Sequence, residues 1–103
     1  MDKREAVRVP VKVQARCRCD DGVVIDGTVE DLSKSGLFLK VDLFLGEGDS
    51  AELDIEVPGE TAPLHLTAQV VRVDDSGMAF KFREQPSRPL ANFIMRQHQT
   101  VIH

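Results

Sequence analysis

Two short segments near the start of the chain combine residue types that can bind an anionic nucleotide. Arg4 and Arg8 carry planar guanidinium groups, which match phosphate oxygens or the O6 and N7 edge of guanine. Residues 31–36 supply the carboxylate of Asp31, the hydroxyl of Ser33 and a final glycine. A carboxylate accepts hydrogen bonds from guanine N1–H and N2–H₂, and glycine lets the main chain come close to a partner. Together the two segments predict a site for an anionic guanine nucleotide.

Composition restricts this site to a local feature of the surface. The chain has 103 residues, enough for one domain with a single modest core, and a formal net charge of −4 at pH 7. Non-specific binding to nucleic-acid polymers needs a broad basic surface. Stacking platforms are also few, because the only aromatic residues are five phenylalanines. We therefore expect no nucleic-acid polymer as a partner.

No segment of the sequence is typical of membrane insertion or secretion. There is no apolar run of about 18 residues, the length of a membrane helix, and the first residues lack the apolar block of a secretory signal. Cys17 and Cys19 are two positions apart on an expected strand, and the histidines show no ligand spacing. We expect a cytoplasmic protein with reduced thiols, no metal, no cofactor and no membrane insertion.

Alternating apolar and polar residues dominate the sequence from residue 9 to residue 83. This period of two is typical of half-buried antiparallel strands, and clusters of Gly, Asp, Ser and Pro separate the runs. The expected strands cover residues 9–19, 23–31, 37–41, 51–57, 64–74 and 78–82. Six strands joined by turns predict a small antiparallel β-barrel, so the fold class is mainly β.

After the last strand the pattern changes to helical spacing. Ser87 is suited to cap a helix and Pro89 to its first turn, and Leu90 and Phe93 follow the helical period. We expect one C-terminal α-helix whose apolar stripe closes one end of the barrel. The chain is then a single domain with an N-terminal segment (1–9), a barrel (10–83) and a helix (87–101).

Each nucleotide-binding segment is weak evidence when taken alone. A pair of arginines near a terminus is more often solvated than functional, and Asp-x-Ser-x-x-Gly is a common turn in which glycine takes the left-handed conformation. Their order along the chain makes them more informative. In an antiparallel pair the start of the first strand lies beside the end of the second, so we expect Arg8 and Asp31 to be neighbours.

With both segments in this order, the chain resembles the PilZ domain family, the bacterial receptor module for cyclic di-GMP. Residues 4–8 match the Arg-x-x-x-Arg element of the family, and residues 31–36 match its Asp/Asn-x-Ser-x-x-Gly element. The likeness continues through residues 36–39, 70–73 and 77–82, and so covers nearly the whole chain. Ser35 stands where many members have a second glycine.

The resemblance implies a six-stranded barrel with a C-terminal helix, as the residue pattern also predicts. It further implies that the N-terminal segment is flexible and wraps over cyclic di-GMP, with Arg4 and Arg8 binding phosphates and guanine Hoogsteen edges. Asp31 and Ser33 would contact a guanine from the barrel surface, and Gly36 would leave room for close approach. These five residues are the expected ligand site.

Two hypotheses of function follow. In the first, the protein is a non-enzymatic receptor in which cyclic di-GMP orders the N-terminal segment and so switches a surface that faces a downstream protein. In the second, it is a PilZ-like interaction adaptor that does not use nucleotide. No catalytic set of nucleophile, base and orienting residue can be assembled, so we expect no enzyme. The sequence leaves open the partner, the number of bound nucleotides and self-association into a homodimer.

Overall fold

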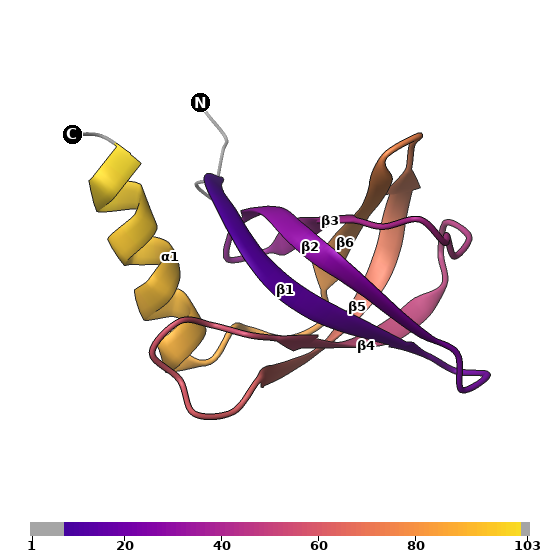
Figure 1. Cartoon of the computed structure of the whole chain (residues 1–103), viewed down its shortest axis with the longest axis horizontal. Helices are drawn as coiled ribbons and strands as arrows, with labels where there is room; N and C mark the ends of the chain where they lie inside the picture. The colour runs from indigo at the N-terminus through magenta and orange to yellow at the C-terminus, as the bar shows by residue number, and fades with distance from the viewer. Residues whose placement is uncertain (1–7, 102–103) are drawn as a thin grey trace.

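The computed structural model describes the backbone of residues 8–101 and the side chains of residues 8–98. In this part of the chain the elements are β1 (Val9–Cys19), β2 (Val24–Leu32), β3 (Gly36–Lys40), β4 (Ser50–Ile55), β5 (Leu64–Val73), β6 (Gly77–Phe82) and α1 (Arg88–Val101). All neighbouring strands are antiparallel, and they close into a barrel in the order β1-β2-β3-β6-β5-β4 (Figure 1). The predicted fold class is confirmed.

One apolar core fills the barrel. Because alternate side chains of a strand point to the same face, the period-two pattern places one apolar side chain in every two toward the interior. Cys17 of β1, Leu37 of β3 and Leu53 of β4 have no exposed surface. Charged residues of the same strands point outward, and Arg16 of β1 and Lys40 of β3 are exposed.

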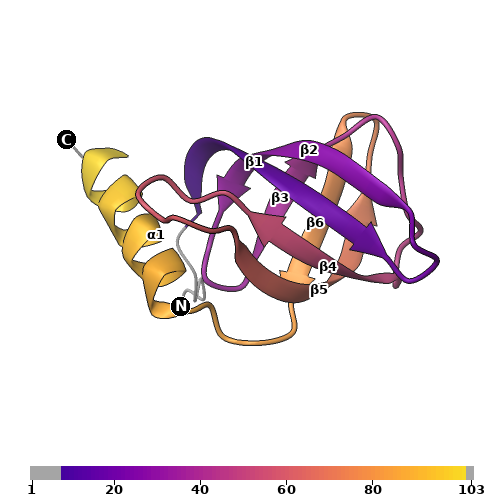
Figure 2. The same cartoon turned by 60° about the horizontal axis from the view of Figure 1, so that its bottom comes forward.

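Helix α1 lies at the end of the barrel where β1 begins (Figures 1 and 2). Its residues Leu90, Phe93 and Ile94 are buried in the common core. Ser87 is in the N-cap position, since its carbonyl accepts the first helical hydrogen bond from the N–H of Ala91 at 2.9 Å. The expected helix is confirmed, with its first residue at Arg88.

Glycines at both ends of the β3–β6 pairing allow the barrel to close. β3 begins at Gly36, opposite Lys81, and β6 begins at Gly77, opposite Lys40. A β-carbon built on Gly77 would lie 2.1 Å from the carbonyl oxygen of Leu39. These two strands are far apart in the sequence, and their backbones approach so closely that no larger residue fits at this position without a shift.

Three valines show how the observed strand ends compare with the expected ones. Val9, which the expectations counted both in the N-terminal segment (1–9) and in the first strand (9–19), is the first residue of β1 and is buried in the core. Val23, the expected first residue of the second strand, precedes β2 and is 46% exposed. Its carbonyl accepts a hydrogen bond from Cys19 N–H in the hairpin. β4 ends before Val57, although the side chain of Val57 is buried.

Candidate functional site

Arg8 and Asp31 are neighbours on the barrel surface, as the strand order predicted. Asp31 lies opposite Pro10 in the β1–β2 register, and Arg8 directly precedes β1. The Arg8 guanidinium donates a hydrogen bond from Nη1 to Oδ1 of Asp31. The Arg8 side chain is 56% exposed and the Asp31 side chain 35% exposed, so both groups can be reached from solvent. A cation and a carboxylate acceptor therefore stand side by side at one edge of the barrel.

A break in strand register points Asp31 outward. The β2–β3 pairing shifts between Val29 and Asp31, and the β1–β2 pairing shifts between Pro10 and Val13. Val29 and Leu32 are both buried, so strict alternation from Val29 would turn Asp31 into the core. An extra residue in a strand redirects the side chains that follow it, and such bulges are frequent beside binding sites. The bulge thus makes the Asp31 carboxylate available.

The side chain of Ser33 is turned into the β2–β3 turn (residues 33–35). Its exposed fraction is 2%. The hydroxyl oxygen accepts hydrogen bonds from the backbone N–H groups of Ser35 and Gly36, each at 3.2 Å. A serine that bonds to the main chain two and three residues ahead stabilises a turn. In this structure Ser33 shapes the loop behind Asp31, whereas the resemblance had implied a direct contact with guanine.

Gly36 is required by the approach of another strand. A β-carbon on Gly36 would lie 2.0 Å from the carbonyl oxygen of Phe80 on β6. In the described part of the chain, positive φ angles occur at Gly22, Gly48 and Gly59, and Gly36 is not among them. The left-handed conformation considered for this position is therefore wrong. The close approach seen at Gly36 is that of the β6 backbone, and the expected approach of a ligand stays a prediction.

A second group of cations lies beside the same turn. Lys34, Lys81 and Arg83 contribute to an open hollow of about 530 Å³ that also reaches Ser35. β6 contacts the turn directly, since Phe82 N–H donates to the carbonyl of Ser35 at 2.8 Å. Sequence reasoning did not place Lys81 and Arg83 beside this turn. Their alternation with buried phenylalanines indicated an outer face, but only the strand order places them next to the turn. Arg4 lies outside the described residues.

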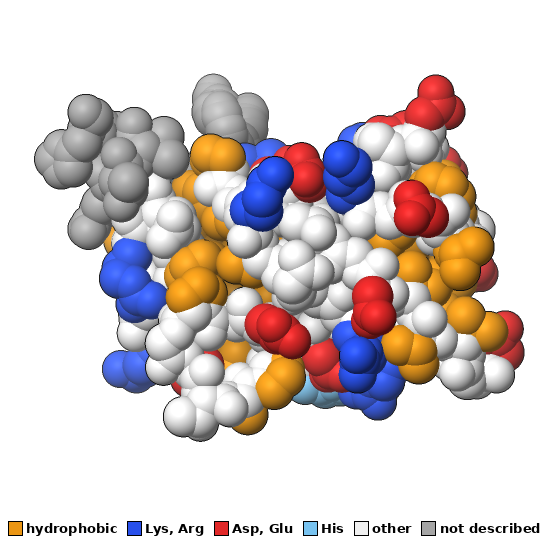
Figure 3. All heavy atoms as spheres, viewed as in Figure 1, with side chains coloured by type: hydrophobic (Ala, Val, Ile, Leu, Met, Phe, Trp, Pro, Cys, Tyr) orange, Lys and Arg blue, Asp and Glu red, His pale blue; other side chains and the backbone are white. Residues whose placement is uncertain are grey.

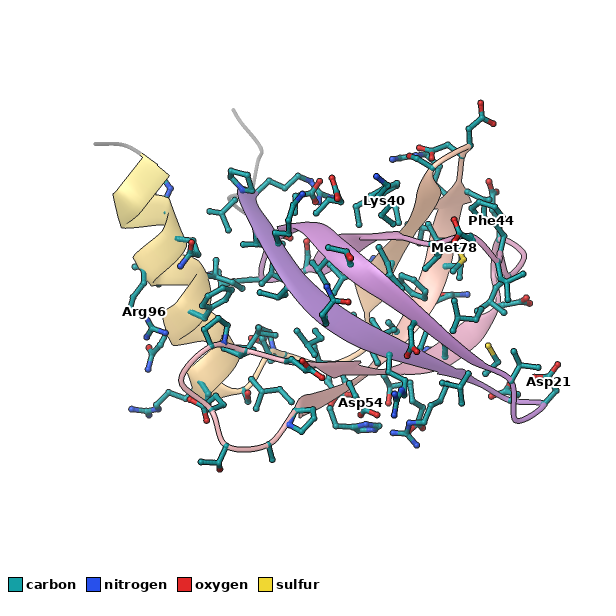
Figure 4. The ribbon with its side chains drawn as sticks, viewed as in Figure 1. Asp21, Lys40, Phe44, Asp54, Met78 and Arg96 are labelled. Atoms are coloured by element: carbon teal, nitrogen blue, oxygen red, sulfur yellow. The ribbon has the colours of Figure 1, made fainter. Side chains whose placement is uncertain are left out.

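Another cluster of charges lies away from this site, on the outer face of β1, β4 and β5. Arg18 donates to Asp54 at 3.0 and 3.2 Å, and both ring nitrogens of His65 lie within 3.0 Å of a carboxylate oxygen, of Asp54 or of Glu52. Partial burial raises the pKa of Asp54, but the hydrogen bonds from His65 and Arg18 outweigh it, so that the pKa is lowered. Figure 4 labels Asp54 in this cluster. The arrangement is one of satisfied ion pairs.

Three further features concern the charge of the surface, metal binding and membrane crossing. On the face seen in Figure 3, Lys and Arg side chains are interspersed with Asp and Glu, and no broad basic area appears. Among the described residues, no three His, Cys, Asp or Glu side chains are grouped so that they could hold a metal ion. The described part also contains no helix of the length and apolar character that crossing a membrane requires.

The molecule is thus a small closed β-barrel with an exposed Arg–Asp pair beside its β2–β3 turn. Residues 2–96 match the family model described as the PilZ domain. The chain belongs to the PilZ domain family. No curated protein matches the sequence.

Solved structures share this fold at low sequence identity. The PilZ domain of YcgR from Escherichia coli, solved with cyclic di-GMP, has a TM-score of 0.78 and 15% identity, over 97% of this chain and 95% of that one. The PilZ domain of CeSA from a cellulose-synthesizing bacterium gives a TM-score of 0.67 and 21% identity, over 94% and 99%. The motility inhibitor MotI of Bacillus subtilis gives 0.80 and 16% over 99% of this chain. Our chain spans 52% of the length of MotI.

Proposed function

We propose that this protein is a receptor that binds cyclic di-GMP at the edge of the barrel where Arg8 meets Asp31. The adjacency of these two side chains is the observation that carries the proposal. It puts a guanidinium suited to phosphate or to the guanine Hoogsteen edge beside a carboxylate suited to guanine N1–H and N2–H₂. Membership of the PilZ family, and the cyclic di-GMP in the solved YcgR domain, support the same ligand.

The five expected site residues then divide into two roles. Arg4 and Arg8 bind the ligand from the N-terminal side, and Asp31 binds a guanine edge from the barrel. Ser33 and Gly36 hold the turn that follows Asp31, because one bonds within the turn and the other admits the β6 backbone. Ser33 contacts the ligand itself only if its hydroxyl leaves these bonds.

Binding would act as a switch that orders the N-terminal segment. In the unliganded protein Arg8 bonds to Asp31, and the ligand offers both residues stronger partners in its two phosphates and its guanine edges. Each new bond holds the preceding segment against the barrel and changes the surface there. A downstream protein that contacts this surface would distinguish the two states.

A calorimetric titration with cyclic di-GMP tests the proposal with a matched control. Arg8→Ala removes one partner of a charged contact, which costs on the order of 2–5 kcal/mol, or at least about 30-fold in affinity. Arg16→Ala is the control, because Arg16 is also exposed on β1 and bonds to Asp26 of β2 at 3.0 Å. It should leave the affinity within about twofold. Equal affinity of Arg8→Ala and the wild type would contradict the proposal.

The same titration decides between the receptor and an adaptor that does not use nucleotide. An adaptor would bind no cyclic di-GMP, and its contacts with a partner would be unchanged by the nucleotide. A wild-type protein that produces no binding signal at any accessible ligand concentration would favour the adaptor.

A further inference from the structure

Arg72 and Phe38 lie on the outer face of the barrel in the same transverse row as Asp31. The row follows four cross-strand pairings: Pro10 opposite Asp31, Asp31 opposite Phe38, Phe38 opposite Ala79, and Ala79 opposite Arg72. Residues that face each other directly across antiparallel strands project to the same side of the sheet. Phe38 is therefore the neighbour of Asp31 on the side away from Arg8.

A second bulge points Arg72 outward. Leu66, Ala68 and Val70 of β5 are buried, so strict alternation would place Arg72 in the core as well. The β5–β6 register shifts between Val70 and Arg72, and the Arg72 side chain is 61% exposed. The same kind of irregularity that makes Asp31 available therefore also brings Arg72 to the face that carries Asp31.

The guanidinium of Arg72 is held against the ring of Phe38. Its Cζ lies 5.8 Å from the ring centroid, within the range of a cation–π contact. Ala79 separates the two residues in the row, and its small side chain lets Arg72 extend across β6. Nη2 of Arg72 also lies 3.6 Å from Oδ2 of Asp74. The guanidinium lies over the ring, and much of the Arg72 side chain remains in solvent.

This arrangement places a planar cation next to the guanine-binding carboxylate. Neighbouring strands are about 4.8 Å apart, so the Cα of Phe38 lies about one strand spacing from that of Asp31. A guanine whose edge bonds to Asp31 and whose ring extends over β3 would lie flat above Phe38 and Arg72. Nucleic-acid bases stack on arginine planes as well as on aromatic rings, and the charge would face a ligand with two phosphates.

We propose that Arg72, layered on Phe38, is a further ligand-binding residue that stacks against the guanine held by Asp31. The site then has arginines on both sides of Asp31: Arg8 beside β1, and Arg72 reaching from β5. This inference rests on the proposed function, because the ligand is cyclic di-GMP. Phe38 is a positioning residue whose ring holds the Arg72 guanidinium in place.

Titration of variants of the 103-residue chain with cyclic di-GMP tests this assignment. Stacking of one base contributes about 1–3 kcal/mol, so Arg72→Ala should weaken binding by about 5-fold or more. Arg72→Lys keeps the charge without the plane and should recover only part of the loss. Phe38→Leu keeps the apolar volume and should weaken binding by a smaller factor.

Arg96→Ala is the matched control. Arg96 lies 6.0 Å from the ring centroid of Phe93, and Figure 4 shows it on α1, pointing away from the barrel. Its loss should leave the affinity within about twofold. Thermal melts of the unliganded variants separate effects on binding from effects on folding. The Arg72 Nε–Hε signal in NMR spectra provides a direct readout, since a stacked base should shift it upfield.

The outcomes separate this inference from the proposed function. If Arg8→Ala loses binding while Arg72→Ala binds as the wild type does, the role of Arg72 is wrong and the receptor function stands. A loss of affinity in Arg72→Ala without any shift of the Arg72 signal in the wild type would also overturn stacking. If the wild type does not bind cyclic di-GMP, both proposals fall.

Discussion

Ser33 and Gly36 hydrogen-bond to each other in both directions. The backbone N–H of Ser33 donates to the carbonyl of Gly36 at 2.9 Å, and the N–H of Gly36 donates to the hydroxyl oxygen of Ser33 at 3.2 Å. These bonds close the turn that joins β2 to β3 immediately after Asp31. The position of the carboxylate thus depends on two neighbours that the surrounding structure holds in place.

Ser33→Ala should destabilise the protein by about 1–2 kcal/mol, because two backbone N–H groups lose the buried acceptor in the turn. Urea denaturation measures this change. Ser76→Ala is a matched control, since Ser76 is an exposed turn serine whose hydroxyl donates to Asp74 at 3.1 Å. It should change stability by less than about 0.5 kcal/mol. Equal effects of the two substitutions would argue against a special role for Ser33.

Gly36→Ala should cost more, about 2–3 kcal/mol, because the new methyl group meets the Phe80 carbonyl and the β3–β6 backbones must separate. Gly46→Ala provides the comparison. A β-carbon there would have Asp49 Oδ2 as its nearest neighbour at 3.5 Å, an ordinary contact. The midpoint of thermal unfolding should fall for the first variant and stay nearly constant for the second. A stable Gly36→Ala protein would show that the strands can separate at little cost.

Acid should remove the stabilisation that Asp54 provides. Because the folded-state pKa of Asp54 is lowered by His65 and Arg18, its contribution is present above the unfolded pKa and disappears as the pH falls below about 4. Asp54→Asn should therefore be less stable than the wild type at pH 7, by up to about 1 kcal/mol, and the difference should shrink toward pH 3. Denaturation curves across this range test the sign. A difference that grows on acidification would contradict it.

The two cysteines should react at different rates with a thiol reagent. Burial, with a smaller effect of the adjacent Cys19 thiol, raises the pKa of Cys17 to about 12, so almost no thiolate forms at pH 8. Cys19 is half-buried, and burial also raises its pKa. Peptide mass mapping after a short exposure should find Cys19 modified first and Cys17 modified only in urea. Rapid modification of Cys17 in the folded protein would contradict this prediction.

The sequence alone predicted the order of the elements and the adjacency of Arg8 and Asp31. The period-two alternation, the turn residues and the cap at Ser87 are local signals, and each has a local physical cause. Antiparallel pairing of consecutive strands then brings the start of β1 to the end of β2 without further information. The family resemblance rested on the same residues.

Only the tertiary structure decided which way the site residues point. Alternation counted along the chain turns Asp31 and Arg72 inward, and the bulges that turn them outward arise from pairing with neighbouring strands. The closure of β3 on β6 is likewise a contact between distant segments. Because of this contact, the β6 backbone lies against Gly36, and Lys81 lies beside the β2–β3 turn. The alternation of side chains can be counted along one strand, whereas register depends on how two strands pair.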